Sequence, residues 1–290
     1  MGRVVVTGAA GFIGRHTVKE LHRRGYSVDA LDIAESRFEE PKRVNYVNCD
    51  VTEDLSNNIE KGDKILHLAA IARFDSAETD PNLALKVNVL GTLNVIQACI
   101  KKEAERLVYS STGSVYPKNP QLPITEDTER RPTSMYGLTK MMAEDLIFLY
   151  GDKLPYIILR YGYVYGKGKD WGAVGAFLKL LNEGKAPTIY GGRQMNDFIY
   201  VKDIVEANIL ALETPFTNKV YNIGTGKPTS IHEVCQICLK AIRTDIKPIV
   251  KPPRPFDFSD FVYDTTKAEK LLGFKAKWTL EEGIVDSLKD

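Results

Sequence analysis

The chain has 290 residues, of which 43% are hydrophobic and 27% are charged, values that are ordinary for a globular protein. Lysine and arginine number 39 against 38 aspartates and glutamates, so the net charge of +1 gives no overall field that favours nucleic acid or a membrane surface. Four scattered cysteines exclude a disulfide framework. Because the first strand is expected to begin at Arg3 and no apolar run reaches the ~18 residues of a membrane span, we expect a cytoplasmic protein without a signal peptide.

The stretch from Val4 to Gly14 combines a short apolar strand with a glycine-rich turn. Three consecutive valines, Val4–Val6, are typical of the buried centre of a parallel sheet, and a helix is expected from Phe12 to Arg24. Between them lie three glycines at three-residue spacing, at Gly8, Gly11 and Gly14. Such a turn lets the backbone approach a pyrophosphate, which the free N–H groups of the helix N-terminus also favour. The stretch therefore predicts a dinucleotide cradle, although its spacing differs from Gly-x-Gly-x-x-Gly.

A second strand, Ser27–Ile33, carries Asp32 near its end, 18 residues beyond Gly14. A carboxylate at this point can accept hydrogen bonds from both ribose hydroxyls of an adenosine and would repel a 2′-phosphate. Asp32 therefore favours NAD over NADP. A solvated aspartate at a strand end is the alternative, and Arg15 and Arg37 are near enough in sequence to offer a phosphate contact.

Strands and helices then continue to alternate along the chain. Alternation at this spacing implies right-handed crossovers, and so an α/β fold with a doubly wound parallel (Rossmann) sheet. A segment with four prolines, Pro117–Thr133, is expected to be a loop. The further strands are expected at Val44–Val47, Ile65–Ala70, Leu107–Ser111 and Tyr156–Leu159, and the helices at Leu83–Lys101 and Met135–Tyr150.

After Gly166 the expected helices and strands become shorter and alternate with prolines. We expect a NAD-binding domain of residues 1–166 and a smaller C-terminal substrate lobe of residues 167–290, joined by a mobile connection, Gly166–Gly172. Segments near residues 197–223 are expected to return and pack on the first domain.

Cys235 and Cys238, with His232 upstream, form the one pattern that suggests a metal or redox site. The two cysteines fall on the apolar face of an expected helix, where cysteine acts as a small hydrophobe. No second ligand pair is available to close a zinc site, so we expect no bound metal.

Tyr136 and Lys140 are four residues apart at the start of an expected helix, which places phenol and ammonium on one face. A free tyrosine has a pKa of roughly 10 and is a poor base at neutral pH. A nearby lysine cation and an oxidised nicotinamide would favour the phenolate, so we expect the pKa of Tyr136 to be lowered. Ser110 and Thr112 end the strand before this helix, at the sheet edge where such folds bind ligands.

Taken together, these stretches resemble the extended short-chain dehydrogenases/reductases, specifically the NAD-dependent nucleotide-sugar epimerases and dehydratases, and most of all epimerases of the UDP-glucose 4-epimerase kind. The resemblance covers nearly the whole chain. It rests on the segments Thr7–Gly14, Cys49–Val51, His67–Ala70, Asn88–Thr92, Tyr109–Tyr116, Ser134–Lys140, Leu159–Gly166, Asp197–Asp203, Tyr221–Gly224, Leu271–Phe274 and Leu280–Gly283.

The resemblance implies roles for individual residues. Tyr136 would be the proton-transfer base, Lys140 its electrostatic partner and ribose anchor, and Thr112 a hydrogen-bonding partner of the reacting oxygen. Substrate contacts would come from Thr112, Tyr163, Asn196 and Arg254. Contacts to the NAD cofactor would come from Gly8, Gly11, Phe12, Ile13, Gly14, Asp32, Asp50, Val51, Leu68, Ala69, Ala70, Asn88, Ser110, Tyr136, Lys140 and Tyr161.

Three departures from the family pattern qualify this picture. Dehydratases carry an Asp-Glu pair directly after the catalytic threonine, where this chain has Gly113 and Ser114, so the chain lacks the acid–base pair that expels water. At two positions that usually contact the substrate diphosphate, Tyr163 replaces an asparagine and Asn196 replaces an arginine.

We therefore expect an isomerase that epimerises a nucleotide sugar at C4 through a transient 4-keto sugar, of the UDP-glucose/UDP-galactose or UDP-uronate type. A nucleotide-sugar 4-ketoreductase with net redox is the alternative, followed by a non-catalytic dinucleotide-binding sensor. The resemblance also implies a homodimer that pairs the helices near Leu83–Lys101 and Met135–Tyr150, and the broad apolar circumference of the second helix agrees with burial on two sides.

Overall fold

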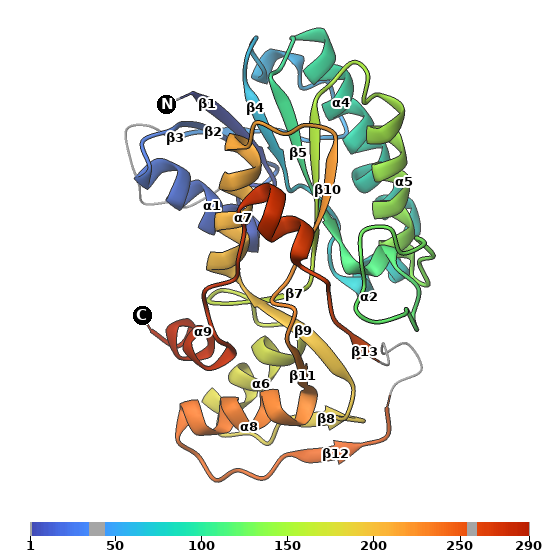
Figure 1. Cartoon of the computed structure of the whole chain (residues 1–290). Coiled ribbons are helices and arrows are strands. Elements are labelled where there is room, and N and C mark those ends of the chain that lie inside the picture. The colour runs from blue at the N-terminus through green and yellow to red at the C-terminus, as the bar shows by residue number, and fades with distance from the viewer. Residues whose placement is uncertain (1, 35–43, 254–259, 290) are drawn as a thin grey trace.

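A computed structural model describes residues 2–34, 44–253 and 260–289. Arg37 and Arg254 lie outside the described residues. The described chain is built on a seven-stranded parallel sheet with the strand order β10-β6-β5-β4-β1-β2-β3 (Figure 1), which confirms the predicted doubly wound α/β fold. Its strands are β1 (Arg3–Thr7), β2 (Ser27–Asp32), β3 (Val44–Asn48), β4 (Lys64–His67), β5 (Arg106–Thr112), β6 (Tyr156–Tyr161) and β10 (Lys219–Ile223).

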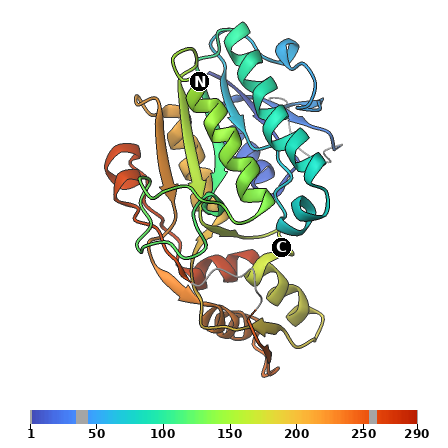
Figure 2. The same cartoon turned by 90° about the vertical axis from the view of Figure 1, so that its right-hand side faces the viewer.

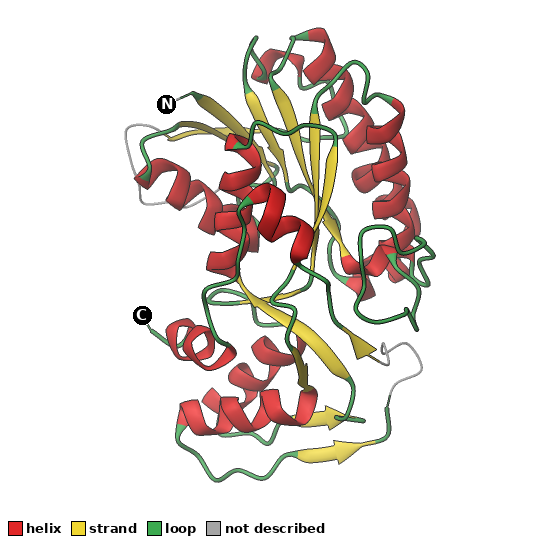
Figure 3. Ribbon diagram, in the orientation of Figure 1, coloured by secondary structure: helices red, strands yellow, loops and turns green. Residues whose placement is uncertain are grey.

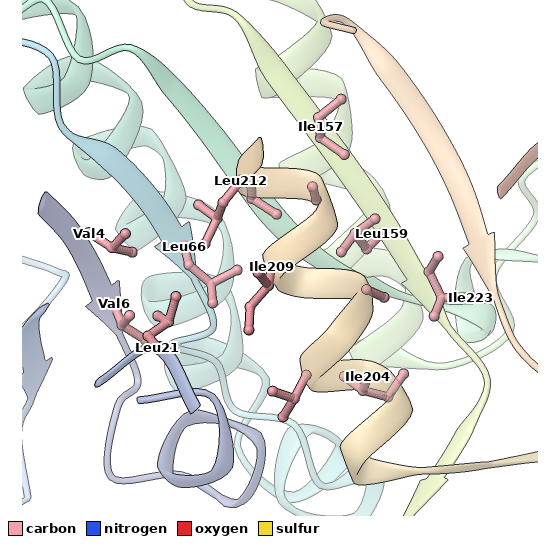
Figure 4. Packing of buried hydrophobic residues seen from close by; sticks show 14 of the residues in the cluster. Val4, Val6, Leu21, Leu66, Ile157, Leu159, Ile204, Ile209, Leu212 and Ile223 are labelled. Carbon is pink, nitrogen blue, oxygen red and sulfur yellow. The ribbon is translucent and has the colours of Figure 1, made fainter. Parts of the chain in front are cut away.

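Helices cover both faces of this sheet, as the red and yellow ribbons of Figure 3 show. On one face lie α1 (Phe12–Arg23) and α7 (Val201–Glu213), and on the other lie α4 (Gly91–Lys101) and α5 (Met135–Leu149). The valines of β1 explain why both layers form. Val4 and Val6 point into the first apolar layer, whereas Val5 packs in the second. In Figure 4, Leu21 lies beside Val6, and Leu66 lies between Val4 and the α7 residues Ile209 and Leu212.

Two elements differ from the sequence-based limits in ways that shape the ligand-binding edge. The strand expected at Ile65–Ala70 ends at His67, because the following residues leave the ladder and run against the glycine turn. The expected helix Leu83–Lys101 begins at Pro81, where Asp80 caps it by accepting a hydrogen bond from the N–H of Leu83 (2.9 Å). It consists of α3 (Pro81–Leu85), a π-helical turn, η2 (Lys86–Leu90), and α4. Such π turns often mark functional positions.

The helix Pro81–Lys101 is long and apolar enough to cross a membrane by length and composition, contrary to the expectation from the sequence. Within the fold, 44% of its apolar window is buried, and the helix packs on the central sheet beside α5. Core helices of globular proteins show the same combination of length and burial.

Most of the remaining elements gather at the carboxyl end of the sheet, in the lower half of Figure 1. Strand β9 (Met195–Tyr200) is the centre of a four-stranded sheet with β7 (Tyr163–Tyr165), β11 (Pro228–Ser230) and β13 (Asp260–Phe261), and β8 (Thr188–Tyr190) pairs with β12 (Ile249–Lys251). The other helices and helical turns are α2 (Phe74–Thr79), α6 (Gly172–Asn182), α8 (Ile231–Ile242), α9 (Leu280–Ser287), η1 (Ser56–Asn58), η3 (Gly113–Val115) and η4 (Ala268–Leu272).

After β9 the chain returns to the large sheet, where α7 covers one face and β10 adds an edge strand next to β6. Both elements follow β7, β8 and β9 in sequence, although those three strands lie in the smaller sheets. The division at residue 166 stays a prediction. The structural role of Cys235 and Cys238 is confirmed, because both are buried on the apolar face of α8. In the described part of the chain, no group of three or more His, Cys, Asp or Glu side chains could hold a metal.

Candidate active site

The turn between β1 and α1 is closed so tightly that two of its glycines cannot be replaced. Gly8 has φ +68°, and a Cβ on it would lie 2.5 Å from the backbone nitrogen of Ala69. A Cβ on Gly14 would overlap the carbonyl oxygen of Gly8. Gly11 is the N-cap of α1, and no side chain caps this helix. The first turn of α1 therefore keeps its N–H groups for an anionic ligand, which fits the pyrophosphate of a dinucleotide.

Asp32 is fixed against the same turn at the end of β2. Its Oδ2 accepts a hydrogen bond from the N–H of Ala10 and its Oδ1 accepts one from the N–H of Ala34, both at 2.9 Å. Each carboxylate oxygen keeps a lone pair for a further donor, as a ribose diol requires. This geometry fits the predicted NAD site better than a freely solvated aspartate does.

Asp50 and Val51, the predicted adenine contacts, follow β3. The Asp50 carboxylate accepts a hydrogen bond from the N–H of Thr52 (2.8 Å), and the carbonyl of Val51 accepts one from the Asn94 side chain (3.1 Å). A Cβ on Gly91 would lie 2.8 Å from Val51, so α4 packs directly on this segment and fixes its backbone.

Asn88, in the π-helical turn, joins two walls of the site. Its side-chain Oδ1 accepts a hydrogen bond from the N–H of Ile71 (2.8 Å), and its Nδ2 donates to the carbonyl of Ile71 (3.2 Å) and to the Thr139 hydroxyl (2.9 Å). Thr139 in turn donates to the carbonyl of Tyr136 (2.9 Å). The amide group of Asn88 therefore holds the segment containing Leu68, Ala69 and Ala70 in place relative to α5.

The sequence gives no indication of a buried polar chain around His67. The Thr7 hydroxyl lies 2.7 Å from Nδ1 of His67 and the Thr92 hydroxyl lies 3.0 Å from Nε2. Thr92 donates its own proton to the carbonyl of Asn88 (2.6 Å), so it accepts from Nε2. Burial, with a smaller contribution from the Lys140 ammonium, lowers the pKa of His67 to about 3. The imidazole is therefore neutral and links β1 and β4 to the π-helical turn.

Thr112 and Tyr136 are brought together by tight packing of α5 on the end of β5. Thr112 ends β5, where its hydroxyl accepts a hydrogen bond from the N–H of Ser114 (3.1 Å). Ser134 caps α5 by accepting from the N–H of Gly137 (3.0 Å), and a Cβ on Gly137 would overlap the carbonyl of Ser114. Tyr136 is the second residue of this helix. Burial raises the pKa of Tyr136 to about 12, and a hydrogen bond with Thr112 acts in the opposite direction.

Lys140, which is predicted to lower the pKa of Tyr136 together with an oxidised nicotinamide, lies four residues further along α5. Lys140 is buried, and its Nζ lies 4.1 Å from the centre of the Tyr109 ring, where it makes a cation–π contact. Burial lowers the pKa of Lys140 to about 7, and the Glu144 carboxylate partly opposes that shift. Burial is thus the larger influence on both side chains in the chain itself, and the lowering of the Tyr136 pKa expected with an oxidised nicotinamide stays a prediction.

The hydroxyls of Ser110 and Tyr161 both donate hydrogen bonds to other groups of the protein. Ser110 donates to the carbonyl of His67 (3.1 Å), and Tyr161 donates to Oδ1 of Asn208 on α7 (2.5 Å). Asn208 donates on to Thr17 of α1 (3.2 Å). Tyr161 pairs in register with Thr112, on the strand next to it, and is itself buried.

Tyr163 and Asn196, the predicted substrate contacts, share one face of the small sheet. Tyr163 pairs with Phe198, two residues from Asn196, and its ring centroid lies 5.7 Å from that of Phe261. Asn196 is buried, and within the described residues its Oδ1 has no hydrogen-bond partner. Arg254, another predicted substrate contact, lies outside the described residues.

Phe261 also explains the glycine that follows Thr112, the predicted catalytic threonine. A Cβ on Gly113 would overlap the Phe261 ring and lie 2.8 Å from the Tyr263 hydroxyl. The aspartate that dehydratases carry at this position therefore has no room here. The packing agrees with the sequence-based argument against dehydration.

A buried ion pair beneath the site was not predicted. Arg160 donates to both oxygens of Glu144, from Nε at 3.0 Å and from Nη2 at 2.7 Å, and their side chains are 3% and 0% exposed. Ser111, beside Thr112, donates to the same carboxylate (2.5 Å). The pair fixes β5, β6 and α5 relative to one another at the catalytic end of the sheet.

Comparison with known proteins agrees with this geometry. The model of a family described as "NAD dependent epimerase/dehydratase family" matches residues 4–224. The UDP-glucose 4-epimerase of Lactobacillus helveticus is 34% identical over 307 residues, which cover 95% of this chain and 92% of the relative. The crystal structure of a UDP-glucose 4-epimerase with UDP-glucose from Thermotoga maritima has a TM-score of 0.92 and 31% identity, covering 98% of this chain and 97% of that one. The UDP-glucuronic acid 4-epimerase of Bacillus cereus, in complex with UDP-glucuronic acid and NAD, has a TM-score of 0.90 and 28% identity, with 98% and 97% covered.

Proposed function

This chain belongs to the NAD dependent epimerase/dehydratase family and is an NAD-dependent enzyme, and from that premise we propose that it inverts C4 of a UDP-sugar. The observation that carries the proposal is the placement of Thr112 and Tyr136 at the carboxyl end of β5, with Gly113 packed against Phe261 in place of a dehydratase acid. This arrangement provides proton transfer at one hydroxyl and no group that expels another as water.

Each residue has a defined part in the proposed reaction. Tyr136 exchanges a proton with the C4 hydroxyl, and Thr112 holds the same oxygen by a hydrogen bond. NAD, which the Gly8–Gly14 turn and Asp32 would hold, would supply hydride chemistry at C4. With the oxidised cofactor in place, its positive charge favours the Tyr136 phenolate that burial otherwise disfavours. Lys140 supports the phenolate and anchors the nicotinamide ribose.

The proposed substrates are UDP-glucose/UDP-galactose or the corresponding UDP-uronates, the classes on which the similar proteins act according to their names. The test is to incubate the purified protein with each UDP-sugar, without added NAD, and to identify the C4 epimer by proton NMR. Appearance of the epimer with no change in NADH absorbance supports epimerisation. Stoichiometric consumption of added NADH with a 4-keto sugar would instead establish the ketoreductase.

For cofactor choice, Asp32→Ala is expected to weaken NAD binding and to relax discrimination against NADP. The carboxylate held by Ala10 and Ala34 would otherwise repel a 2′-phosphate at close range. Titration of both dinucleotides into wild type and variant measures the effect. Wild-type protein that binds NADP more tightly than NAD would contradict the assignment, and Arg15 would become the residue to test.

We further propose a homodimer formed through α4 and α5, which lie side by side on one surface (Figure 2). Leu83, Leu90, Leu138 and Leu149 are exposed on α5 and on the helix Pro81–Lys101, Leu149 to 74%. Exposed apolar side chains gathered over two adjacent helices are typical of a protein–protein interface.

Met142→Lys is therefore expected to convert the dimer to a monomer, because a two-fold interface receives the added charge twice. Light scattering coupled to gel filtration measures the mass. Gln236→Lys, on the exposed side of α8, serves as the control and is expected to stay dimeric. A wild-type protein that is monomeric at micromolar concentration would refute the interface.

A further inference from the structure

Two cationic side chains from distant parts of the chain converge on Trp171. The Nζ of Lys169 lies 3.7 Å from the centre of the indole ring, and the guanidinium carbon of Arg73 lies 5.8 Å from it. Lys169 belongs to the connection between β7 and α6, whereas Arg73 immediately precedes α2 in the segment that follows β4. We refer to Lys169, Trp171 and Arg73 as the Trp171 cluster.

The Trp171 cluster borders the glycine turn. The Nζ of Lys169 lies 5.7 Å from the centre of the Phe12 ring, and Phe12 is the first residue of α1. Arg73 lies four residues after Ala69, whose backbone touches the Gly8 turn. The two cations therefore come from the two segments that flank the dinucleotide cradle.

The connection that carries Lys169, expected from its composition to be mobile, contacts α1 at several points. The carbonyl of Lys167 lies 2.9 Å from the His16 ring nitrogen, and a Cβ on Gly168 would lie 3.4 Å from the Arg15 guanidinium. Because these contacts fall within the first two turns of α1, the connection runs across the phosphate-binding end of that helix.

Within the described residues, no carboxylate forms an ion pair with Lys169 or Arg73. Lys169 donates one hydrogen bond, to the carbonyl of Val164 (2.7 Å), and the neighbouring Asp170 pairs with Lys179 instead (3.3 Å). Burial lowers the pKa of Lys169 to about 8. A half-buried ammonium without an ion-pair partner favours the binding of an anion beside it.

We propose that the connection Gly166–Gly172 is a strap over the bound cofactor, in which Lys169, assisted by Arg73, binds the pyrophosphate of NAD. The proposal depends on the NAD dependence of the family and not on the identity of the sugar. It gives the protein a means to retain its dinucleotide, which an enzyme that regenerates NAD within each turnover requires. A substrate diphosphate has the same chemistry, so the experiment separates the two sources.

The test is Lys169→Met, which keeps the aliphatic chain on Trp171 and removes the charge. Because a hydrogen bond to a charged group contributes more than a neutral one, we expect a Kd for NAD at least about tenfold weaker by calorimetry. Less NAD is also expected per subunit after gel filtration. Affinity for adenosine, which lacks the pyrophosphate, is expected to be unchanged. The control is Lys167→Met in the same connection. The exposed Nζ of Lys167 contacts the Lys289 carbonyl (2.7 Å), and its removal is expected to leave the Kd for NAD within about twofold of wild type.

Three results would overturn the proposal. A Kd for NAD within about twofold of wild type in Lys169→Met would show that the ammonium makes no contact with the cofactor. An equal loss of adenosine affinity would mean that packing, not charge, had changed. Weakened binding of UDP with unchanged binding of NAD would assign the cation to the substrate diphosphate. If Lys169→Met does not fold, the same titrations are made on Arg73→Met, because Arg73 is exposed. An unchanged Kd for NAD in Arg73→Met would then overturn the proposal. All titrations omit the sugar, so a failed epimerase assay is a separate result.

Discussion

Tyr136→Phe is expected to lower kcat by ~10²–10⁴-fold, the usual contribution of general acid–base catalysis, while the fold and the bound NAD persist. The substitution removes one hydroxyl and keeps the ring that packs at the start of α5. A phenylalanine ring carries no acidic or basic group, so it cannot transfer the proton once the hydroxyl is lost. The measurement is the rate of epimer formation at saturating substrate, with NAD content determined on the same samples.

Tyr150→Phe provides the matched control, because Tyr150 caps the other end of α5, away from Thr112. Its kcat is expected to equal that of wild type. A Tyr136→Phe enzyme within about threefold of wild type would contradict the assignment of the base. Lys140→Met is expected to slow the reaction as well and to shift the alkaline limb of the pH profile upward, since the phenolate loses a nearby cation.

Arg160→Leu is expected to reduce the free energy of unfolding by about 3–5 kcal/mol, because it leaves the Glu144 carboxylate buried without its main partner. For a chain of this size, the loss corresponds to a fall in Tm on the order of 10 °C. Thermal unfolding followed by circular dichroism measures it. Ser111 donates to the same carboxylate beside Thr112, so kcat is expected to fall as well.

Arg130→Leu is the matched control, because Arg130 reaches the same Glu144 oxygen from a longer distance, 3.3 Å, with a side chain that is 24% exposed. Its effect on Tm is expected to be small. The double variant Arg160→Leu/Glu144→Leu removes both charges and is expected to recover much of the lost stability. A double variant as unstable as Arg160→Leu alone would show that shape, not charge, determines the loss.

The elements that sequence patterns predicted well are those in which one physical demand dominates. Val4–Val6 must be apolar because the strand is covered on both faces, and Gly8 and Gly14 admit no side chain. The apolar period of α8 also identified Cys235 and Cys238 as core residues rather than ligands. In each case, the constraint acts within a few residues along the chain.

The features that could not be predicted depend on residues far apart in sequence. His67 joins Thr7 to Thr92, and Glu144 meets Arg160 only once β5, β6 and α5 are assembled. The surroundings of Tyr136, which set its pKa, depend on the same assembly. A spacing of four residues reveals that Lys140 is near, but the extent of burial, which raises that pKa, is set by the whole fold.

The return of β10 to the edge of the large sheet affects how a newly made chain reaches its native state. β6 ends at Tyr161 and its neighbour β10 begins at Lys219, so 57 residues separate two paired strands. At the ~5–20 residues per second of synthesis, β6 waits roughly 3–11 s for that partner, and for α7 to cover Ile157 and Leu159. During those seconds the nascent chain exposes an unpaired strand edge and an apolar face, the surfaces that chaperones protect and that premature termination would leave open.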